Sequence, residues 1–232
     1  VDAMATWPLL PVFKVASGDI TNVPLLRSVA NVYAHRAPKD HPLIVSTGAS
    51  NMAEVIAARR VLIDGGLDDE QVVWLACTLA YPTLPADAEL GRITTLRSFT
   101  NPSWRVGYSD HVGLVGSALG ATVLGAELLE VHCTLDPGRV TACPDDAIAL
   151  GPVDLALYVQ AAGQGAAMVG SGAIAPIPAE RPARQQARRS ICAARDLPSG
   201  TVLTEHDLIC LRPGDGEPPT RWDEVVGCTL LR

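Results

Sequence analysis

Short apolar runs alternate with longer segments of helical periodicity through the first 133 residues of the chain. The apolar runs are rich in β-branched residues and carry few charges, as expected of strands that are covered on both faces. These runs cover residues 12–17, 43–47, 72–76, 105–109 and 128–133, and the helical segments cover 24–36, 51–65, 90–99 and 113–125. Repeated βα units predict an α/β fold with a parallel sheet.

The helical segment after the second run carries its own start and stop signals. Asn51, with Glu54 three residues later, matches a capping box, in which each side chain accepts a hydrogen bond from the other residue's backbone N–H. Gly65 and Gly66 supply a matching stop. These signals support the division into βα units independently of hydrophobicity.

Polar side chains collect where the predicted strands end. They are Lys14, Ser17 and Asp19, then Ser46 and Thr47, then Cys77, Thr78 and Tyr81, then Ser109, Asp110 and His111, and finally His132 and Thr134. In a parallel α/β barrel the carboxyl ends of the strands form the active face. One such cluster alone is better explained as a helix N-cap, so the prediction of a functional site depends on its recurrence in successive units.

Two histidines, His111 and His132, each end an apolar run. If the two runs are neighbouring parallel strands, both imidazoles emerge at the same mouth of the barrel. Neutral imidazoles suit a divalent metal from Mn²⁺ to Zn²⁺, and two protein ligands leave positions for water and a substrate oxygen. Lys14 lies inside an apolar strand, where an ammonium is costly to bury unless it meets an anion. The sequence therefore predicts a metal site beside an anion-binding lysine.

The composition changes to Gly, Ala and Pro from residue 161, which is typical of a linker. Beyond it, short strand-like runs are separated by Pro-Ser-Gly and Pro-Gly-Asp-Gly turns, which predict a second, small and mostly β module. We therefore divide the chain into a barrel domain at 1–163, a linker at 164–187 and the β module at 188–232.

Charge and composition narrow the class of protein. A net charge of −7 disfavours nucleic acid as a partner, although residues 181–195 carry five arginines. The apolar residues, 48% of the chain, are interrupted by charges too often for a membrane span. The six cysteines form no C-x-x-C pair and fit buried or incidental thiols better than disulfides or zinc ligands. We expect a cytoplasmic protein that acts on small molecules and binds neither nucleic acid nor membrane.

Several segments match motifs of one enzyme family, in the family's order and spaced as βα units. They are residues 13–22, 44–48, 77–83, 108–111, 130–136, 188–196 and 212–216. Together they resemble the sialic acid synthase (N-acetylneuraminate synthase) family, transferases that join phosphoenolpyruvate to an N-acylated mannosamine or a related sugar. The resemblance implies a TIM-type barrel followed by an antifreeze-like (SAF) domain that reaches over the barrel of the partner subunit in a domain-swapped homodimer.

The resemblance also implies roles for individual residues of this chain. His111 and His132 match the ligands of a divalent metal, Mn²⁺ above all. The positions that match contacts to phosphoenolpyruvate are Lys14, Ser17, Ser46 and Ser109. Asp19 stands where the family often has a glutamate near the reacting carbons, so the catalytic set is Lys14, Asp19, His111 and His132. Tyr81 and Asp145 match sugar-binding positions, and Arg189 matches the SAF-domain arginine that reaches the N-acyl group of the sugar.

The chain departs from the family's pattern in two respects: the number of βα units and the residues expected to contact the substrate. Five predicted strands fall short of the eight that close a TIM-type barrel, so the first three βα units are expected to be lacking, and the SAF domain to be truncated. Leu79 stands where the family commonly has asparagine, and the loop 136–146 is altered. A lost polar contact of about 1–3 kcal/mol is enough to change the preferred sugar.

Three hypotheses about function follow. The leading one is metal-dependent condensation of phosphoenolpyruvate with an aldose, which forms a 2-keto-3-deoxy sugar acid of the sialic type and releases phosphate. In it the metal polarises the aldehyde, C3 of phosphoenolpyruvate attacks, and water adds at C2. The alternative is a non-catalytic relative that serves as a sugar-binding or assembly subunit. The third is an aldolase-type barrel with Lys14 as a Schiff-base lysine, which leaves the histidine pair without a role.

Overall fold

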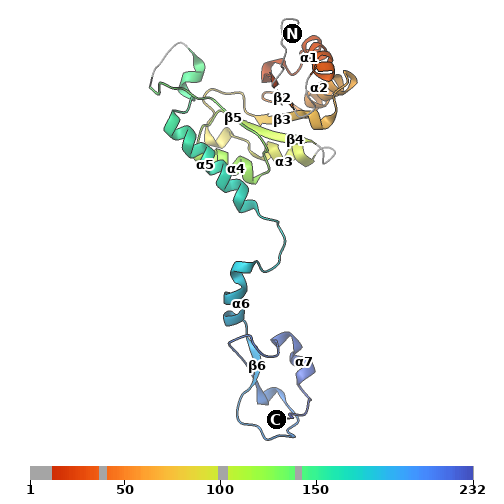
Figure 1. Ribbon diagram of the computed structural model, residues 1–232, viewed down its shortest axis with the longest axis vertical. Coiled ribbons are helices and arrows are strands. Elements are labelled where there is room, and N and C mark those ends of the chain that lie inside the picture. The colour runs from red at the N-terminus through yellow and green to blue at the C-terminus, as the bar shows by residue number, and fades with distance from the viewer. Residues whose placement is uncertain (1–11, 37–40, 99–103, 139–142, 232) are drawn as a thin grey trace. The chain divides into compact units, whose positions relative to one another are not determined.

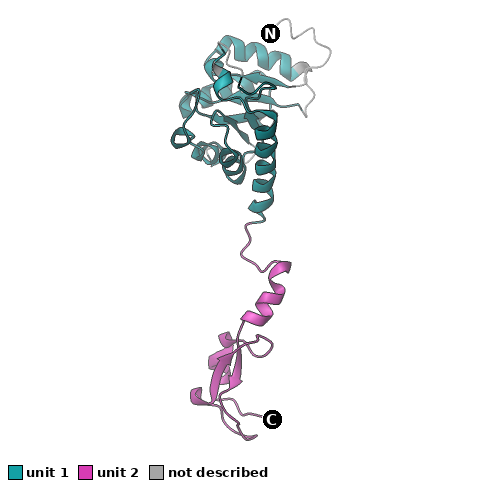
Figure 2. Cartoon of the chain, turned by 90° about the vertical axis from the view of Figure 1, so that its left-hand side faces the viewer, with its two compact units in different colours: residues 1–171 teal, residues 172–232 magenta. Residues whose placement is uncertain are grey.

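The computed structural model describes residues 12–36, 41–98, 104–138 and 143–231 (Figure 1). The chain divides into two compact units, Val1–Ser171 and Gly172–Arg232, shown in teal and magenta in Figure 2.

Unit 1 is built on a curled sheet of five parallel strands in the order β1-β2-β3-β4-β5 (Figure 1). The strands are β1 (Phe13–Val15), β2 (Leu43–Ser46), β3 (Val72–Cys77), β4 (Arg105–Asp110) and β5 (Leu129–Val131). Strands that follow one another in the sequence are neighbours in the sheet, so the predicted α/β fold with a parallel sheet is confirmed. As a result β1 and β5 form the two edges.

Helices follow the strands as the βα pattern predicts. They are α1 (Val23–Arg36), α2 (Met52–Asp64), α3 (Gly91–Ser98), α4 (Val115–Val123) and α5 (Pro152–Val169). The predicted capping box is present: the Asn51 side chain accepts the Glu54 N–H at 3.1 Å, and the Glu54 carboxylate accepts the Asn51 N–H at 2.8 Å. Gly65 ends α2, as the sequence indicates.

The main core lies between the helices and one face of the sheet. Its strand residues include Val15, Leu43, Val45, Trp74 and Val106, all of them buried. Because successive strand residues point to opposite faces, the intervening residues project from the concave face. At the carboxyl ends of the strands these are Lys14 on β1, Ser46 on β2, Cys77 on β3, Ser109 on β4 and Glu130 on β5.

Helix α5 continues through the position at which the sequence placed the domain boundary. Residues 164–169 lie in the predicted linker, but they belong to this helix, and the two units divide after Ser171. One glycine of this Gly- and Ala-rich segment has a packing role: a Cβ on Gly165 would lie 3.0 Å from the carbonyl oxygen of Leu119 and 3.2 Å from the Cβ of Thr122. Gly165 therefore lets α4 and α5 approach closely.

Unit 2 contains α6 (Arg181–Ala187), β6 (Ser190–Ala193), β7 (Leu208–Leu211) and α7 (Trp222–Val225). The two strands are antiparallel, and an isolated bridge joins Val202 to Thr229. Helix α6 occupies part of the segment predicted to be a linker. Among the described residues of both units, short 3-10 helices lie at Ser17–Asp19, Asp69–Gln71, Pro85–Asp87, Pro144–Ala147, Pro178–Glu180, Glu205–Asp207 and Pro219–Arg221. Within the ranges that the structure describes, every helix is too short or too polar to cross a bilayer.

Candidate functional site

The site residues that the sequence predicts in unit 1 lie at or just beyond the carboxyl ends of the strands. Cys77, Ser109 and Glu130 are paired in register across β3, β4 and β5. This arrangement gives the concave face a row of polar groups at one level, where an enclosed α/β sheet otherwise carries aliphatic side chains. This row marks the concave face as the location of the candidate site.

The two predicted histidines lie together, with ring centroids 5.4 Å apart. His111 follows β4, is only 4% exposed, and its Nδ1 lies 2.8 Å from the carbonyl oxygen of Thr78. A proton on Nδ1 that is donated to this carbonyl leaves Nε2 of His111 as a lone-pair donor. The hydrogen bond thus selects the tautomer that binds a metal.

His132 follows β5 and is more open than His111. Its side chain is 28% exposed, and its Nδ1 lies 3.6 Å from a carboxylate oxygen of Asp145. Its carbonyl oxygen accepts the N–H of Leu150 at 2.8 Å, which fixes the backbone of the strand end. A carboxylate on the Nδ1 side again directs Nε2 toward a ligand, as outer carboxylates do in metal sites.

Tyr81 lies against both histidine rings. Its ring centroid is 4.3 Å from that of His111 and 5.9 Å from that of His132. Burial raises the pKa of the Tyr81 hydroxyl above its usual value, and Cys77 and nearby carboxylates raise it further. The phenol therefore remains a hydrogen-bond donor beside the histidine pair at neutral pH.

The charge state of His111 is set by opposing effects. Burial lowers the pKa of this imidazole, but hydrogen bonds with the sulfur of Cys77, at 3.9 Å, and the carbonyl of Thr78 raise it, and the net direction is upward. A metal bound at Nε2 must displace a proton to the extent that the imidazole is charged.

The spacing of the histidine pair is compatible with a shared divalent cation. Two imidazoles that bind one ion through Nε2 have ring centroids about 5 Å apart, and those of His111 and His132 are 5.4 Å apart. Among the described residues no group of three or more His, Cys, Asp and Glu side chains is placed to hold an ion. The pair would thus supply two ligands and leave the remaining positions open.

Asp110 anchors the loop that carries His111, a role that the sequence reasoning missed. This carboxylate is 1% exposed and accepts four hydrogen bonds. They come from the N–H groups of Val112 and Gly113 at 2.8 and 3.1 Å, the Ser117 hydroxyl at 2.5 Å and the Tyr158 hydroxyl at 2.8 Å. Burial raises the pKa of Tyr158, which keeps its hydroxyl a donor. Asp110 therefore ties the end of β4 to α4 and α5.

Lys14 does meet a negative charge, and the partner is Glu130, which the sequence reasoning also missed. Its ammonium lies 2.6 Å from Oε1 of Glu130, and the Ser109 hydroxyl donates to the same oxygen at 2.8 Å. The signal was available, because Glu130 is a single charge inside an apolar run, as Lys14 is. A buried or half-buried charge needs a partner of opposite sign.

The two other predicted serines differ in their environments. The Ser17 hydroxyl accepts the N–H of Gly48 at 3.1 Å, and a Cβ on Gly48 would lie 2.6 Å from that hydroxyl, so only glycine fits there. Ser46 is 1% exposed, and its hydroxyl has no hydrogen-bond partner among the described residues. A buried hydroxyl without a partner calls for a specific explanation, and a ligand oxygen at this face supplies one.

Three candidates lie apart from this network or join it only at its edge. Asp19 contacts the side chain of Asn22 at 3.4 Å. Asp145 reaches the site from its edge, through Nδ1 of His132. Arg189 belongs to unit 2, where its guanidinium donates to the carbonyl oxygen of Cys210 at 2.8 Å. Leu79, which the sequence marks as a departure, is 44% exposed, and its Cβ lies next to Gly48.

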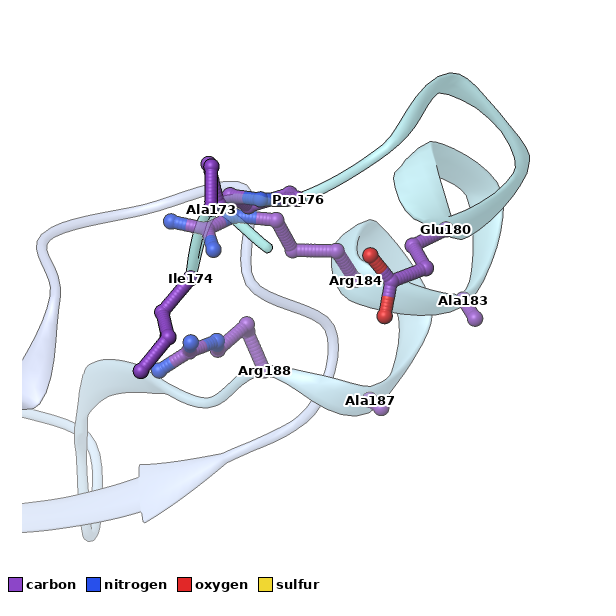
Figure 3. A pocket seen from close by; sticks show the side chains of 9 residues that line it. Ala173, Ile174, Pro176, Glu180, Ala183, Arg184, Ala187 and Arg188 are labelled. Atoms are coloured by element: carbon purple, nitrogen blue, oxygen red, sulfur yellow. The ribbon is translucent and has the colours of Figure 1, made fainter. Parts of the chain in front are cut away.

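Unit 2 has a surface hollow of about 680 Å³, shown in Figure 3. It lies between the segment at 173–176 and α6, and its charged lining residues are Glu180, Arg184 and Arg188. Apolar side chains make up the rest of its wall. It lacks the histidines, serines and lysine that define the strand-end site, so the chemistry of unit 1 identifies the site better than the size of a hollow does.

The comparisons with known proteins agree with this architecture. A family model described as the NeuB family matches residues 2–173, and a SAF domain model matches residues 188–232. The chain is 38% identical to the N,N'-diacetyllegionaminic acid synthase of Legionella pneumophila over 94% of its length, and 30% identical to the human N-acetylneuraminate-9-phosphate synthase over 96%. It spans 58% of the length of each of these relatives.

Among solved structures, the N-acetylneuraminic acid synthetase of Leptospira borgpetersenii, crystallised with citrate, superposes with a TM-score of 0.65 at 28% identity. The superposition covers 75% of this chain and 56% of that one. The curled five-stranded sheet thus has the form of part of a TIM-like barrel.

Proposed function

The chain belongs to the NeuB family and carries a SAF domain, and from this premise we propose that it condenses phosphoenolpyruvate with an N-acylated mannosamine or a related aldose. The product is a sialic-type 2-keto-3-deoxy sugar acid, and phosphate is released. One observation carries the proposal: His111 and His132 lie 5.4 Å apart on the side of the sheet where Lys14, Ser46 and Ser109 project. A cation held by the histidines and an anion held by these other residues would then face the same space.

Phosphoenolpyruvate would bind to the row of polar groups at the strand ends. The ammonium of Lys14 neutralises a phosphate or carboxylate oxygen, and the hydroxyls of Ser46 and Ser109 donate to others. The hydroxyl of Ser46 is otherwise without a partner among the described residues, so a ligand oxygen would satisfy it. Ser17, beside the close approach at Gly48, extends this cradle.

His111 and His132 would hold a divalent cation, and we propose Mn²⁺. When bound, such a cation supplies positive charge to a carbonyl oxygen of the substrate. The protein's own part is to fix the two rings: the Thr78 carbonyl orients His111, Asp145 lies beside Nδ1 of His132, and Asp110 holds the loop of His111.

The aldose would bind over the histidine pair. Tyr81 offers a phenol donor and an aromatic face, and Asp145 an acceptor for a sugar hydroxyl. Asp19 lies after β1 and would act near the reacting carbons. We also propose a homodimer in which Arg189 of one protomer reaches the N-acyl group bound by the other.

In the proposed reaction the C3–C2 double bond of phosphoenolpyruvate attacks the aldehyde carbon, and a new C–C bond forms. Water then adds to C2 and gives up its two protons, one to the alkoxide formed from the aldehyde oxygen and one to the departing phosphate. The bond between C2 and the bridging phosphate oxygen breaks, which releases phosphate and leaves the keto group. Lys14 stabilises negative charge on the phosphate or carboxylate throughout, which is an electrostatic contribution rather than a covalent one.

The other two hypotheses differ in how well they agree with this geometry. A Schiff-base lysine needs a free amine, whereas the ammonium of Lys14 lies 2.6 Å from a carboxylate. Borohydride trapping with pyruvate tests this reading, and failure to trap removes it. A non-catalytic subunit is favoured by Leu79, which places an apolar, 44% exposed side chain beside Gly48.

The experiment is an assay of phosphate release from phosphoenolpyruvate with Mn²⁺ and a panel of N-acylated aldoses. The protein should include any sequence that precedes residue 1 in the natural chain. We expect release that requires an aldose, stops with a chelator and is lost in His111→Ala. Release that is absent from a folded, metal-loaded protein with every aldose refutes the proposal and leaves the binding-subunit hypothesis.

A further inference from the structure

An ion pair spans the concave face from one edge strand to the other. Lys14 lies on β1 and Glu130 on β5, the two strands at opposite edges of the sheet, yet their charged atoms are 2.6 Å apart. The curl of the sheet brings them together across its concave side. The pair thus joins the two edge strands across the concave face.

One oxygen of Glu130 accepts from two groups at once. Oε1 receives the ammonium of Lys14 at 2.6 Å and the hydroxyl of Ser109 at 2.8 Å. In the part of the chain that the structure describes, Oε2 accepts no hydrogen bond. A single anionic oxygen held by an ammonium and a hydroxyl is the arrangement that a phosphate or carboxylate ligand would also adopt.

We infer that the Glu130 carboxylate is an internal substitute for the anionic substrate: it occupies the position of a ligand oxygen between Lys14 and Ser109 and withdraws when the ligand binds. The inference rests on the proposed function for the identity of that ligand, phosphoenolpyruvate. The side chains of Lys14 and Glu130 are 36% and 29% exposed, so solvent and ligand both have access to the pair.

The ion pair between Glu130 and Lys14 makes the site selective for anions and lowers its affinity for them. Before the substrate binds, Glu130 keeps the lysine ordered and its charge compensated. A neutral ligand cannot replace the carboxylate, so Glu130 selects for ligands that carry negative charge on oxygen. An anion binds only to protein molecules in which Glu130 has moved away from Lys14. Its apparent affinity is therefore the intrinsic affinity multiplied by the fraction of molecules in that state.

The test is direct binding of phosphoenolpyruvate, and of inorganic phosphate as a simpler probe, measured by calorimetry on the full-length protein. Glu130→Gln keeps an oxygen acceptor for Ser109 but removes the charge that competes for Lys14. We expect phosphoenolpyruvate to bind about five-fold more tightly, the size of effect that a half-exposed ion pair produces. If Glu130 served only to support the fold, the same substitution would leave affinity unchanged or weaken it.

Glu127→Gln is the matched control. Glu127 is a half-exposed glutamate three residues earlier, and it pairs with Arg97 and Arg105. Its neutralisation changes the net charge of the protein by the same amount, and we expect affinity to stay within two-fold of wild type. A gain that appears in both variants reflects general electrostatics and overturns the inference.

Further variants keep the test decisive. Glu130→Asp retains the charge but withdraws it by one methylene, so it should also tighten binding, by less than Glu130→Gln, and it serves where the latter does not fold. In a Lys14→Met background, Glu130→Gln should bring no gain, because the lysine that the carboxylate competes for is gone. A gain in that background contradicts the inference.

The result is separable from the proposed function. Phosphate release by the wild-type protein decides whether the chain is a synthase. Tighter binding by Glu130→Gln without any release by wild type refutes the synthase and keeps the anion site that Glu130 occupies. Phosphate release by wild type, together with equal or weaker binding of phosphoenolpyruvate by folded Glu130→Gln, supports the synthase and refutes the role inferred for Glu130.

Discussion

The two units of this chain bury their residues differently, and the difference shows where chemistry can be placed. Unit 1 has a covered face of the sheet filled with aliphatic and aromatic side chains. In unit 2 the only residues below 9% exposure among those described are Ser190, Leu203 and Asp207. Because a large core stabilises unit 1, its concave face can carry polar groups.

Among the described residues, each unit nevertheless contains one buried aspartate with several hydrogen bonds. In unit 1, Asp110 is bonded by backbone N–H groups and two hydroxyls. In unit 2, Asp207 accepts from the backbone and hydroxyl of Thr204 at 3.0 and 2.6 Å and from Arg195 at 2.5 Å. The donors to Asp110 are neutral groups between packed helices, whereas the donors to Asp207 include a cation, Arg195, at the surface. The predictions below test whether this contrast holds in solution.

Asp110→Ala should have the largest effect on the stability of unit 1. It leaves two buried hydroxyls and two backbone N–H groups without their acceptor, so we expect the free energy of unfolding to fall by about 3–5 kcal/mol. Urea unfolding followed by circular dichroism measures it. Asp145→Ala is the control, because that side chain is 45% exposed. A loss of unfolding free energy above about 1 kcal/mol in this control would contradict the idea that burial of Asp110 causes the larger loss.

His111→Ala and His132→Ala should each weaken Mn²⁺ binding by more than about 100-fold, since even partners outside the ligand set change metal affinity by 10–100-fold. Calorimetric titration with Mn²⁺ is the measurement. The matched control is His206→Ala, an exposed histidine of unit 2. Equal Mn²⁺ affinity in wild type and both site variants would remove the metal from the proposed function. Asp145→Asn should weaken binding by about 10-fold, as an outer partner of His132.

Gly165→Ala tests whether α5 belongs to the core of unit 1. The new Cβ would meet the Leu119 carbonyl at 3.0 Å, so we expect a loss of about 1–2 kcal/mol from overpacking. Gly163→Ala lies two residues away in the same helix, where a Cβ meets nothing within 4 Å. It should stabilise the protein by about 0.5–1 kcal/mol, because alanine favours the helix. Equal effects of the two variants would place residue 165 in a flexible linker after all.

The same pair of glycines shows what the sequence could and could not predict. The strands of unit 1 follow from short β-branched runs, and the meeting of His111 with His132 follows from neighbouring strand ends. The Gly- and Ala-rich sequence after residue 161 suggested a linker, because composition alone does not distinguish a helix breaker from a close helix contact. That distinction depends on α4, more than forty residues away in the sequence.

The partners of the charged residues also could not be predicted from the sequence. The logic that marked Lys14 as needing an anion applies equally to Glu130, yet it does not say that the two edge strands curl until the charges meet. For Asp110, the Tyr158 hydroxyl comes from 48 residues further along the chain. Such pairs depend on the curvature of the sheet and on helix packing, which local pattern does not specify.

The smallest effect we predict concerns the acid sensitivity of unit 2. Hydrogen bonds from the side chain and backbone of Thr204, together with Arg195, lower the pKa of Asp207 below its usual value. A carboxyl whose folded pKa is lowered adds stability above its unfolded pKa of about 3.9, and this stability is lost as pH falls through the folded pKa. Unit 2 should therefore lose stability below about pH 4 through this residue.

Asp207→Asn isolates that contribution, because a protonated carboxyl and an amide are both neutral. The difference in unfolding free energy between wild type and Asp207→Asn, followed through the amide signals of unit 2 by NMR in urea, should be larger at pH 7 than at pH 2.5. Asp223→Asn, an exposed carboxylate on α7, should show a difference near zero at both pH values. A wild-type advantage over Asp207→Asn that persists unchanged in acid would mean that Asp207 acts by shape and not by charge. The contrast with the neutrally bonded Asp110 would then disappear.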